Sequence, residues 1–224
     1  MRAIPLLSIA FLILPATARA ADAPAKTNAD LPLLFHTTFA SPDDLKKFTL
    51  TDPAAWKLVD DTVGDQKRPV LSLTKQSAYK PPHRSPVNLA LINDVKAATF
   101  IMEVRCKITQ KPIPNRDVCF AFGYAGPAQF CYAHLSQKTS PNHHDLFVVD
   151  KKDRAPVSTQ RSDGTPWTDG YHTIKIVRTA DATTVYFDGK QMLATDSKAL
   201  PTGQLGVGSF DDTANFAEIT AWGK

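Results

Sequence analysis

Residues able to hold or process a sugar are concentrated in the middle of the sequence. Over residues 129–136, Phe130, Tyr132 and His134 alternate with other residues, so in a β-strand they share one face. Aromatic rings suit the C–H faces of pyranoses, and the polar tips of tyrosine and histidine form hydrogen bonds. The row predicts either the core face of a sheet or a sugar platform, and the core is the simpler interpretation.

The same region holds the residue types that a polysaccharide lyase uses. Such an enzyme needs a cation that neutralises a uronate carboxylate. It also needs a tyrosine or histidine that removes one proton and returns another to the leaving oxygen. The candidate catalytic residues are therefore Tyr132, His134, Arg105 and His144. The alternative is that these side chains are structural hydrogen-bonding groups.

Four further side chains are candidates for substrate binding. The guanidinium fork of an arginine binds two oxygens of a carboxylate or sulfate at once, whereas a glutamate accepts hydrogen bonds from hydroxyls and a phenylalanine offers a stacking surface. The candidates of these types are Arg84, Arg116, Glu103 and Phe130.

Composition restricts the hydrolytic chemistry. A glycosidase needs two carboxyl groups at a set separation. Among its 22 acidic residues the chain has only two glutamates, Glu103 and Glu218. Glu103 is the only acid on the strand expected over residues 100–108. Machinery built on paired glutamates is therefore nearly excluded.

Residues 1–20 have the features of a secretory signal peptide. Arg2 supplies the positive start, Ile4–Leu14 is apolar, and small residues flank position 19. The apolar run is about 11 residues long, whereas a membrane span needs roughly 20. We therefore expect cleavage near Ala20 and a secreted or periplasmic mature chain without a membrane span.

Charge argues against a nucleic-acid partner. Without Arg2 and Arg19, 24 basic residues face 22 acidic ones, and no block of lysine and arginine stands out. Residues 21–32 are polar and rich in alanine and proline, and are predicted to form a flexible leader.

Three cysteines, Cys106, Cys119 and Cys131, remain in an oxidising compartment. The odd number leaves at least one free thiol. Cys106 and Cys119 flank a segment with two prolines, so they could face each other on a hairpin and form a disulfide. The alternative is that all three are buried small apolar residues.

The pattern beyond residue 32 is that of short strands. Residues 100–108 alternate apolar and polar side chains, Asp188-Gly189 is a hairpin turn, and Ser41-Pro42 starts a short helix that ends near Phe48. About a dozen such strands without intervening helices predict an all-β chain. We expect residues 33–224 to form one domain, a two-sheet antiparallel jelly-roll sandwich.

Two sets of motifs resemble the concanavalin A-like lectin/glucanase superfamily, including laminin-G-like and 3-keto-disaccharide hydrolase-like domains. The first set runs from Tyr171-His172 through Asp188-Gly189 to Gly203–Phe210, and is similar to the strands that close such a jelly roll. The second set is similar to a group of secreted bacterial proteins within the superfamily. It comprises Arg84-Ser85-Pro86, 115–124, 130–135, 147–149 and 209–213.

The resemblance implies a glycan-binding concave face, where we expect the candidate side chains to converge. Those expected in one groove are Glu103, Arg105, Tyr132 and His134, with His144 or Arg84 on its wall. The E-x-D-x-E strand of the superfamily's glucanases is absent. The expected function is carbohydrate binding or processing, with a polysaccharide or oligosaccharide as partner. The alternatives are a polysaccharide lyase or unusual glycoside hydrolase, and a laminin-G-like module that binds another envelope protein.

The resemblance also implies a structural calcium ion, because such sandwiches often hold one near the first and last strands. Asp211 and Asp212 precede the last strand and offer hard oxygen ligands, so they are the candidates; the alternative is a solvated turn. Zinc at His143-His144 is disfavoured, because adjacent side chains on a strand point to opposite faces. No cofactor is required.

Overall fold

The computed structural model describes residues 31–196 and 201–224. The expected signal peptide, residues 1–20, and nearly all of the expected leader, residues 21–32, lie outside this part of the chain. Within it, no helix has the length and apolar character needed to cross a membrane.

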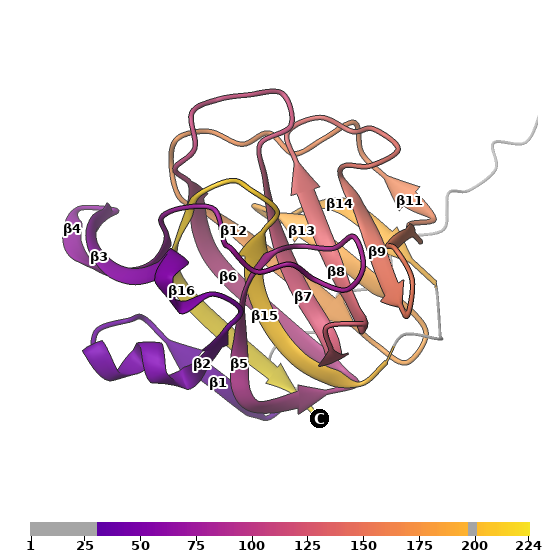
Figure 1. The fold of residues 1–224 in the computed structure, drawn as a ribbon, viewed down its shortest axis with the longest axis horizontal. Coiled ribbons are helices and arrows are strands. Elements are labelled where there is room, and N and C mark those ends of the chain that lie inside the picture. The colour runs from indigo at the N-terminus through magenta and orange to yellow at the C-terminus, as the bar shows by residue number, and fades with distance from the viewer. Residues whose placement is uncertain (1–30, 197–200) are drawn as a thin grey trace, which may run out of the picture.

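Two antiparallel sheets, here called sheet A and sheet B, form the domain. Sheet B lies in front of sheet A in the view of Figure 1. Sheet A has nine strands, in the spatial order β11 (Gln160–Arg161), β14 (Lys190–Thr195), β13 (Thr183–Phe187), β12 (His172–Arg178), β6 (Phe100–Ile108), β16 (Ala214–Gly223), β4 (Gln66–Leu73) and β3 (Trp56–Val63), with β1 (Leu33–Thr37) paired to β16. Sheet B has seven, in the order β10 (Ala155–Pro156), β9 (Asp145–Asp150), β8 (Gln129–Ser136), β7 (Asp117–Gly126), β15 (Gly203–Ser209), β5 (Asn88–Ala97) and β2 (Phe48–Leu50). The predicted all-β sandwich is confirmed.

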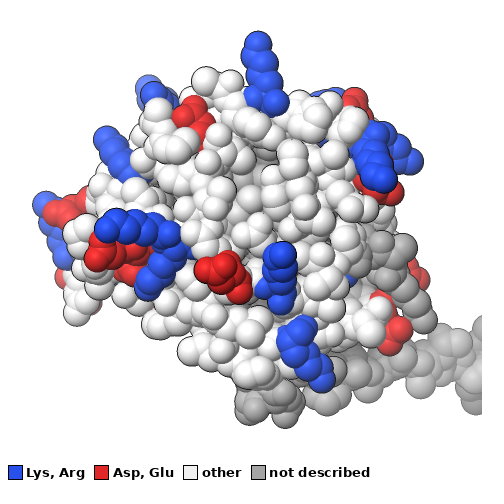
Figure 2. Space-filling model, turned by 60° about the horizontal axis from the view of Figure 1, so that its bottom comes forward, with Lys and Arg blue, Asp and Glu red and all other residues white. Residues whose placement is uncertain are grey.

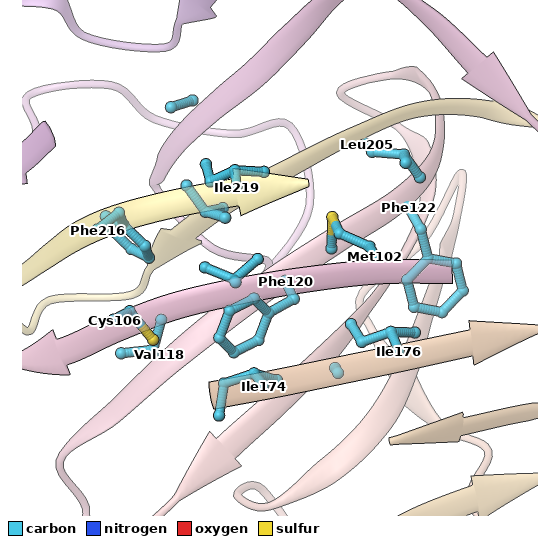
Figure 3. Packing of buried hydrophobic residues seen from close by; sticks show 14 of the residues in the cluster. Met102, Cys106, Val118, Phe120, Phe122, Ile174, Ile176, Leu205, Phe216 and Ile219 are labelled. Carbon is cyan, nitrogen blue, oxygen red and sulfur yellow. The ribbon is translucent and has the colours of Figure 1, made fainter. Parts of the chain in front are cut away.

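The main core lies between the two sheets (Figure 3). Met102 and Cys106 of β6 face Phe120 and Phe122 of β7, and all four are fully buried. Every second residue of each strand enters this layer, which is why the sequence alternates. Burial of these side chains is the main force that holds the sheets together, at roughly 25 cal/mol per Å² of apolar surface.

The helix start and the hairpin turn that the sequence predicts are both present in the structure. The 3₁₀ helix η2 (Pro42–Lys47) begins with a capping box, in which Ser41 Oγ accepts from the Asp43 N–H at 3.2 Å and Asp44 Oδ2 accepts from the Ser41 N–H at 3.1 Å. A second 3₁₀ helix, η3 (Pro53–Ala55), follows β2. At the β13–β14 turn, Asp188 and Gly189 both have positive φ, at 47° and 81°, as a tight hairpin requires.

The hairpin that Cys106 and Cys119 could have shared does not form. β6 and β7 follow each other in the chain but belong to different sheets. Cys106 faces the main core, whereas Cys119 lies in a cluster on the outer face of sheet B. All three cysteines are free and buried, so the alternative interpretation, small apolar core residues, describes them.

A second apolar layer covers the outer face of sheet B. It contains Phe130, Tyr132 and Phe147, which are at most 1% exposed. The segment 74–87, between β4 and β5, crosses in front of β15, β7 and β8 (Figure 1). The Arg84 N–H donates to Asp153 Oδ1 at 2.8 Å, and the Arg154 N–H donates to the Arg84 carbonyl at 3.2 Å. These bonds tie the segment to the turn after β9.

Candidate functional site

An open groove crosses the outer face of sheet A. It consists of two adjoining cavities of about 340 and 330 Å³ that share Glu103 and Thr173. We call it the Glu103 groove. Its other lining residues are Val104, Arg105, Tyr171, Glu218 and Thr220 in the first cavity and Lys175, Tyr186 and Gly189 in the second.

Both glutamates of the chain line this groove. In the pairing of β6 with β16, Glu103 is opposite Thr220, and Arg105 is opposite Glu218. Glu103 and Glu218 are therefore diagonal neighbours on one face, a relationship that places residues roughly 7–8 Å apart. The small number of glutamates did not reveal this arrangement, because two residues far apart in sequence meet through strand pairing.

Each glutamate has a basic side chain beside it. Lys175 Nζ lies 3.2 Å from Glu103 Oε1, and His36 Nε2 lies 3.1 Å from Glu218 Oε1. The Lys175 and Glu103 side chains are 28% and 31% exposed, so both can be reached from solvent. The groove thus offers hydrogen-bond acceptors and donors side by side, which suits the hydroxyl groups of a sugar.

Asp61 fixes one end of the groove. Its Oδ2 accepts from the Tyr171 hydroxyl at 2.8 Å and from Asn215 Nδ2 at 2.6 Å, and lies 2.8 Å from Lys107 Nζ. Burial alone would raise the Asp61 pKa, but the hydrogen bonds from Lys107, Asn215 and Tyr171 lower it to about 2. The Tyr171 ring is therefore held by a carboxylate that stays charged at neutral pH.

The predicted row on β8 occupies the other side of the sandwich. Phe130, Tyr132 and His134 do share one face, as the alternation predicts, but this is the outer face of sheet B. Glu103 and Arg105 are on the outer face of sheet A. The expectation that the four groove residues converge is wrong, because β6 and β8 join different sheets and their outer faces point in opposite directions.

The core interpretation describes the β8 row, but this core is the second layer, on the outer face of sheet B. The ring faces are neither between the sheets nor open to solvent, since Tyr132 is 0% and His134 1% exposed. Arg154 Nη1 donates to the Tyr132 hydroxyl at 3.0 Å and lies 3.5 Å from His134 Nδ1. Burial is the main reason that the Tyr132 pKa lies well above its usual value. A buried phenol that keeps its proton is poorly suited to be a lyase base.

His134 lies against a pair of buried carboxyl groups. Its Nε2 is 2.9 Å from Asp117 Oδ2, with an orientation that does not make a straight hydrogen bond. Asp212 Oδ2 accepts from the Asp117 N–H at 2.6 Å. Burial and the charge of Asp117 raise the Asp212 pKa to about 7. Asp212 therefore holds a proton over much of the acidic range.

Asp211 and Asp212 gain a third acidic neighbour. Their carboxylates and that of Asp117 lie within 4.8 Å of one another, and Asp211 is the exposed member. This oxygen-only set fits the ligand preference of calcium. Calcium at Asp211 and Asp212 stays a prediction, with Asp117 as an added ligand.

Two other predicted site residues have structural partners. His144 is 0% exposed, and its Nε2 and Nδ1 lie 2.8 and 3.2 Å from the hydroxyls of Ser162 and Thr165. Arg116 is 3% exposed and donates to Gln137 Oε1 at 2.8 Å and the Trp167 carbonyl at 2.8 Å. Arg84, in contrast, is exposed.

Sequence reasoning missed Arg154, Tyr171 and Glu218. Arg154 lies in a polar turn without periodicity, where no local signal marks it. Glu218 shares its strand face with Thr220, so its outward direction was predictable from alternation. Its nearness to Glu103 depends on strand register, which the sequence does not display.

Comparisons with known proteins bear on the fold. No family model matches the chain, and no curated protein sequence does. Among solved structures, the carbohydrate-binding module CBM66 from Bacillus subtilis is 12% identical, with a TM-score of 0.57, over 79% of this chain and 95% of that one. Domain 4 of a Geobacillus stearothermophilus arabinanase, solved with arabinotriose, is 10% identical, with a TM-score of 0.57, over 86% and 93%.

A third similar structure is a β-glucanase from Bacillus licheniformis. It is 12% identical, with a TM-score of 0.50, over 86% of this chain and 98% of that one. At these identities the likeness concerns the fold. The chain has the concanavalin A-like jelly-roll fold, as the motifs of its sequence indicated.

Proposed function

We propose that the protein binds a polysaccharide or oligosaccharide along the Glu103 groove. The observation that carries the proposal is the pair of adjoining cavities, which together offer an elongated, solvent-open surface. Hydroxyls, carboxylates and cations line it, and Tyr186 supplies an aromatic ring in the second cavity. A sugar chain needs this combination of polar partners and ring stacking.

Similar folds support the same function class. The similar structures include a carbohydrate-binding module, an arabinanase domain and a β-glucanase. A fold hosts many functions, so the groove's own chemistry has to decide. The predicted signal peptide suits a protein that meets polysaccharides outside the cytoplasm, and secretion remains part of the proposal.

The groove residues give a direct test. Immobilised neutral and uronic-acid polysaccharides should retain the protein, and Tyr186→Ala should weaken retention about tenfold because stacking area is lost. Tyr186→Phe keeps the ring and should bind nearly as well. Tyr79→Ala, in segment 74–87 over the other sheet, is the matched control. Full retention of Tyr186→Ala would remove the groove from the proposal.

Hydrolysis is the second candidate, because Glu103 and Glu218 lie diagonally in one cavity. New reducing ends that vanish in both Glu103→Gln and Glu218→Gln would establish hydrolysis; retention without new ends favours binding alone.

The lyase alternative is weakened by the separation of Arg105 from Tyr132 and His134. The protein-binding alternative lacks a broad apolar patch, because Leu33 and Ile113 are the exposed large apolar residues among residues 31–196 and 201–224. Figure 2 likewise shows charges of both signs interspersed over the face in view, without a block of one sign.

A further inference from the structure

The guanidinium group of Arg154 is held rigidly at the edge of sheet B. Arg154 follows β9, and its Cζ atom lies 4.5 Å from the ring centre of Phe147 and 4.4 Å from that of Phe210. Stacking between two aromatic rings fixes the plane of the guanidinium group. Hydrogen bonds to the Tyr132 hydroxyl at 3.0 Å and the Asn142 carbonyl at 2.7 Å fix its rotation.

These partners leave the charge of Arg154 without a counter-ion. The hydroxyl, the carbonyl and the His134 ring nitrogen at 3.5 Å are not carboxylates. Within residues 31–196 and 201–224, no acidic side chain forms an ion pair with Arg154. A guanidinium group has five N–H donors, so Nε and one hydrogen of Nη2 are left for another acceptor. The side chain is half-buried, so solvent and solutes can reach it.

A second arginine stands beside it. The Arg154 N–H donates to the Arg84 carbonyl at 3.2 Å, which places the two residues on adjacent backbone segments. Arg84 is exposed, and its side chain has no hydrogen bond or ion pair within the described chain. The nearest acid, Asp153, is exposed and accepts the Arg84 backbone N–H through Oδ1 at 2.8 Å.

Both arginines act on the same neighbour, His143. Its ring lies 5.6 Å from that of His134 in a T-shaped arrangement. Burial lowers the His143 pKa most. The charges of His134, Arg154 and Arg84 lower it further, and the charge of Asp117 opposes them. Both guanidinium groups therefore act on one partly exposed place beside His143, where a bound anion would be attracted to both.

We propose that Arg154 and Arg84 form an anion site that takes the carboxylate or sulfate group of an acidic saccharide. A fixed guanidinium fork matches two oxygens of either group, and the second arginine adds charge. The site is on the sheet opposite the Glu103 groove. That this site binds anions does not depend on the proposed function. That the anion belongs to a saccharide rests on the proposed function.

Two ligands that differ by one group provide the test. The full-length protein is titrated with methyl glucuronide and with methyl glucoside at constant ionic strength, and amide NMR shifts report the affinity and the place of binding. We expect glucuronide to bind at least tenfold more tightly than glucoside at residues near Arg84, His143 and Arg154. Arg84→Gln should abolish this preference, whereas Lys57→Gln, an exposed charge on β3, should preserve it.

The outcomes separate the two parts of the proposal. Equal binding of glucuronide and glucoside would overturn the anion site. Binding of inorganic sulfate without any binding of glucuronide would overturn its saccharide part. Glucuronide preference lost in Arg154→Lys, with an unchanged melting temperature, would support recognition by the fork itself. Loss of retention on Tyr186→Ala reports on the Glu103 groove alone, so failure there is distinguishable from failure here.

Discussion

Nη1 of Arg154 lies 3.0 Å from the Tyr132 hydroxyl, and this bond connects the turn after β9 to the middle of β8. Tyr132 is fully buried, so its hydroxyl has no access to water as an alternative partner. Through this bond a charged side chain, Arg154, contacts the apolar layer on sheet B. The same arginine is therefore expected to contribute both to the stability of this layer and to the proposed anion site.

Arg154→Met should lower the free energy of unfolding by about 2 kcal/mol, because it leaves a buried hydroxyl without a partner. Tyr132→Phe removes the hydroxyl itself and should cost less, about 1 kcal/mol. The double variant should be no less stable than Arg154→Met alone, since both single changes delete the same bond. Urea denaturation measures all three, and strictly additive losses would contradict the coupling.

His144 should make the protein sensitive to mild acid. Burial, with the charges of His134 and Arg161, lowers its folded-state pKa to about 4, against 6.5 for an unperturbed histidine. As pH falls from 6.5 to 4 the unfolded chain takes up a proton that the folded chain does not, so stability falls by up to about 3 kcal/mol.

His144→Asn is the matched variant for this prediction. His144 has a φ of 60°, a left-handed conformation that asparagine tolerates. The variant should have a flatter stability profile between pH 6.5 and 4 in denaturation experiments, even if it is less stable overall. An unchanged slope would show that other groups control the acid response.

The three thiols should be inert in the folded protein. Cys106, Cys119 and Cys131 are free and at most 1% exposed, and burial raises the pKa of each, that of Cys131 to about 12. A chromogenic disulfide reagent at pH 8 should therefore label none within minutes and all three after denaturation. Intact mass without reduction should match three free thiols; a loss of two mass units would reveal a disulfide.

Gly206 should be intolerant of a side chain. β15 lies between β5 and β7, and a Cβ atom at Gly206 would meet the Ala90 carbonyl oxygen at 2.7 Å. Gly206→Ala should cost roughly 2–3 kcal/mol through overpacking. Gly126→Ala places the same methyl group where no atom lies within 4 Å and should be nearly neutral. Thermal melts of the two variants compare them, and similar melting temperatures would contradict the packing argument.

Local features of this protein followed from the sequence alone. Alternation correctly grouped Phe130 with Tyr132 and His134, and Ser41-Pro42 and Asp188-Gly189 marked a helix start and a hairpin turn. These signals are local, because strand alternation, caps and turns depend on residues only a few positions apart.

Tertiary structure decided which side chains meet. Alternation assigns a residue to one face of its strand, but it does not say which sheet the strand joins. Arg105 and Tyr132 were therefore expected in one groove, yet they lie on the outer faces of two different sheets, which point away from each other. The meeting of Glu103 with Glu218 and of Arg154 with Tyr132 depends on long-range pairing and on a turn, and neither leaves a periodic signal in the sequence.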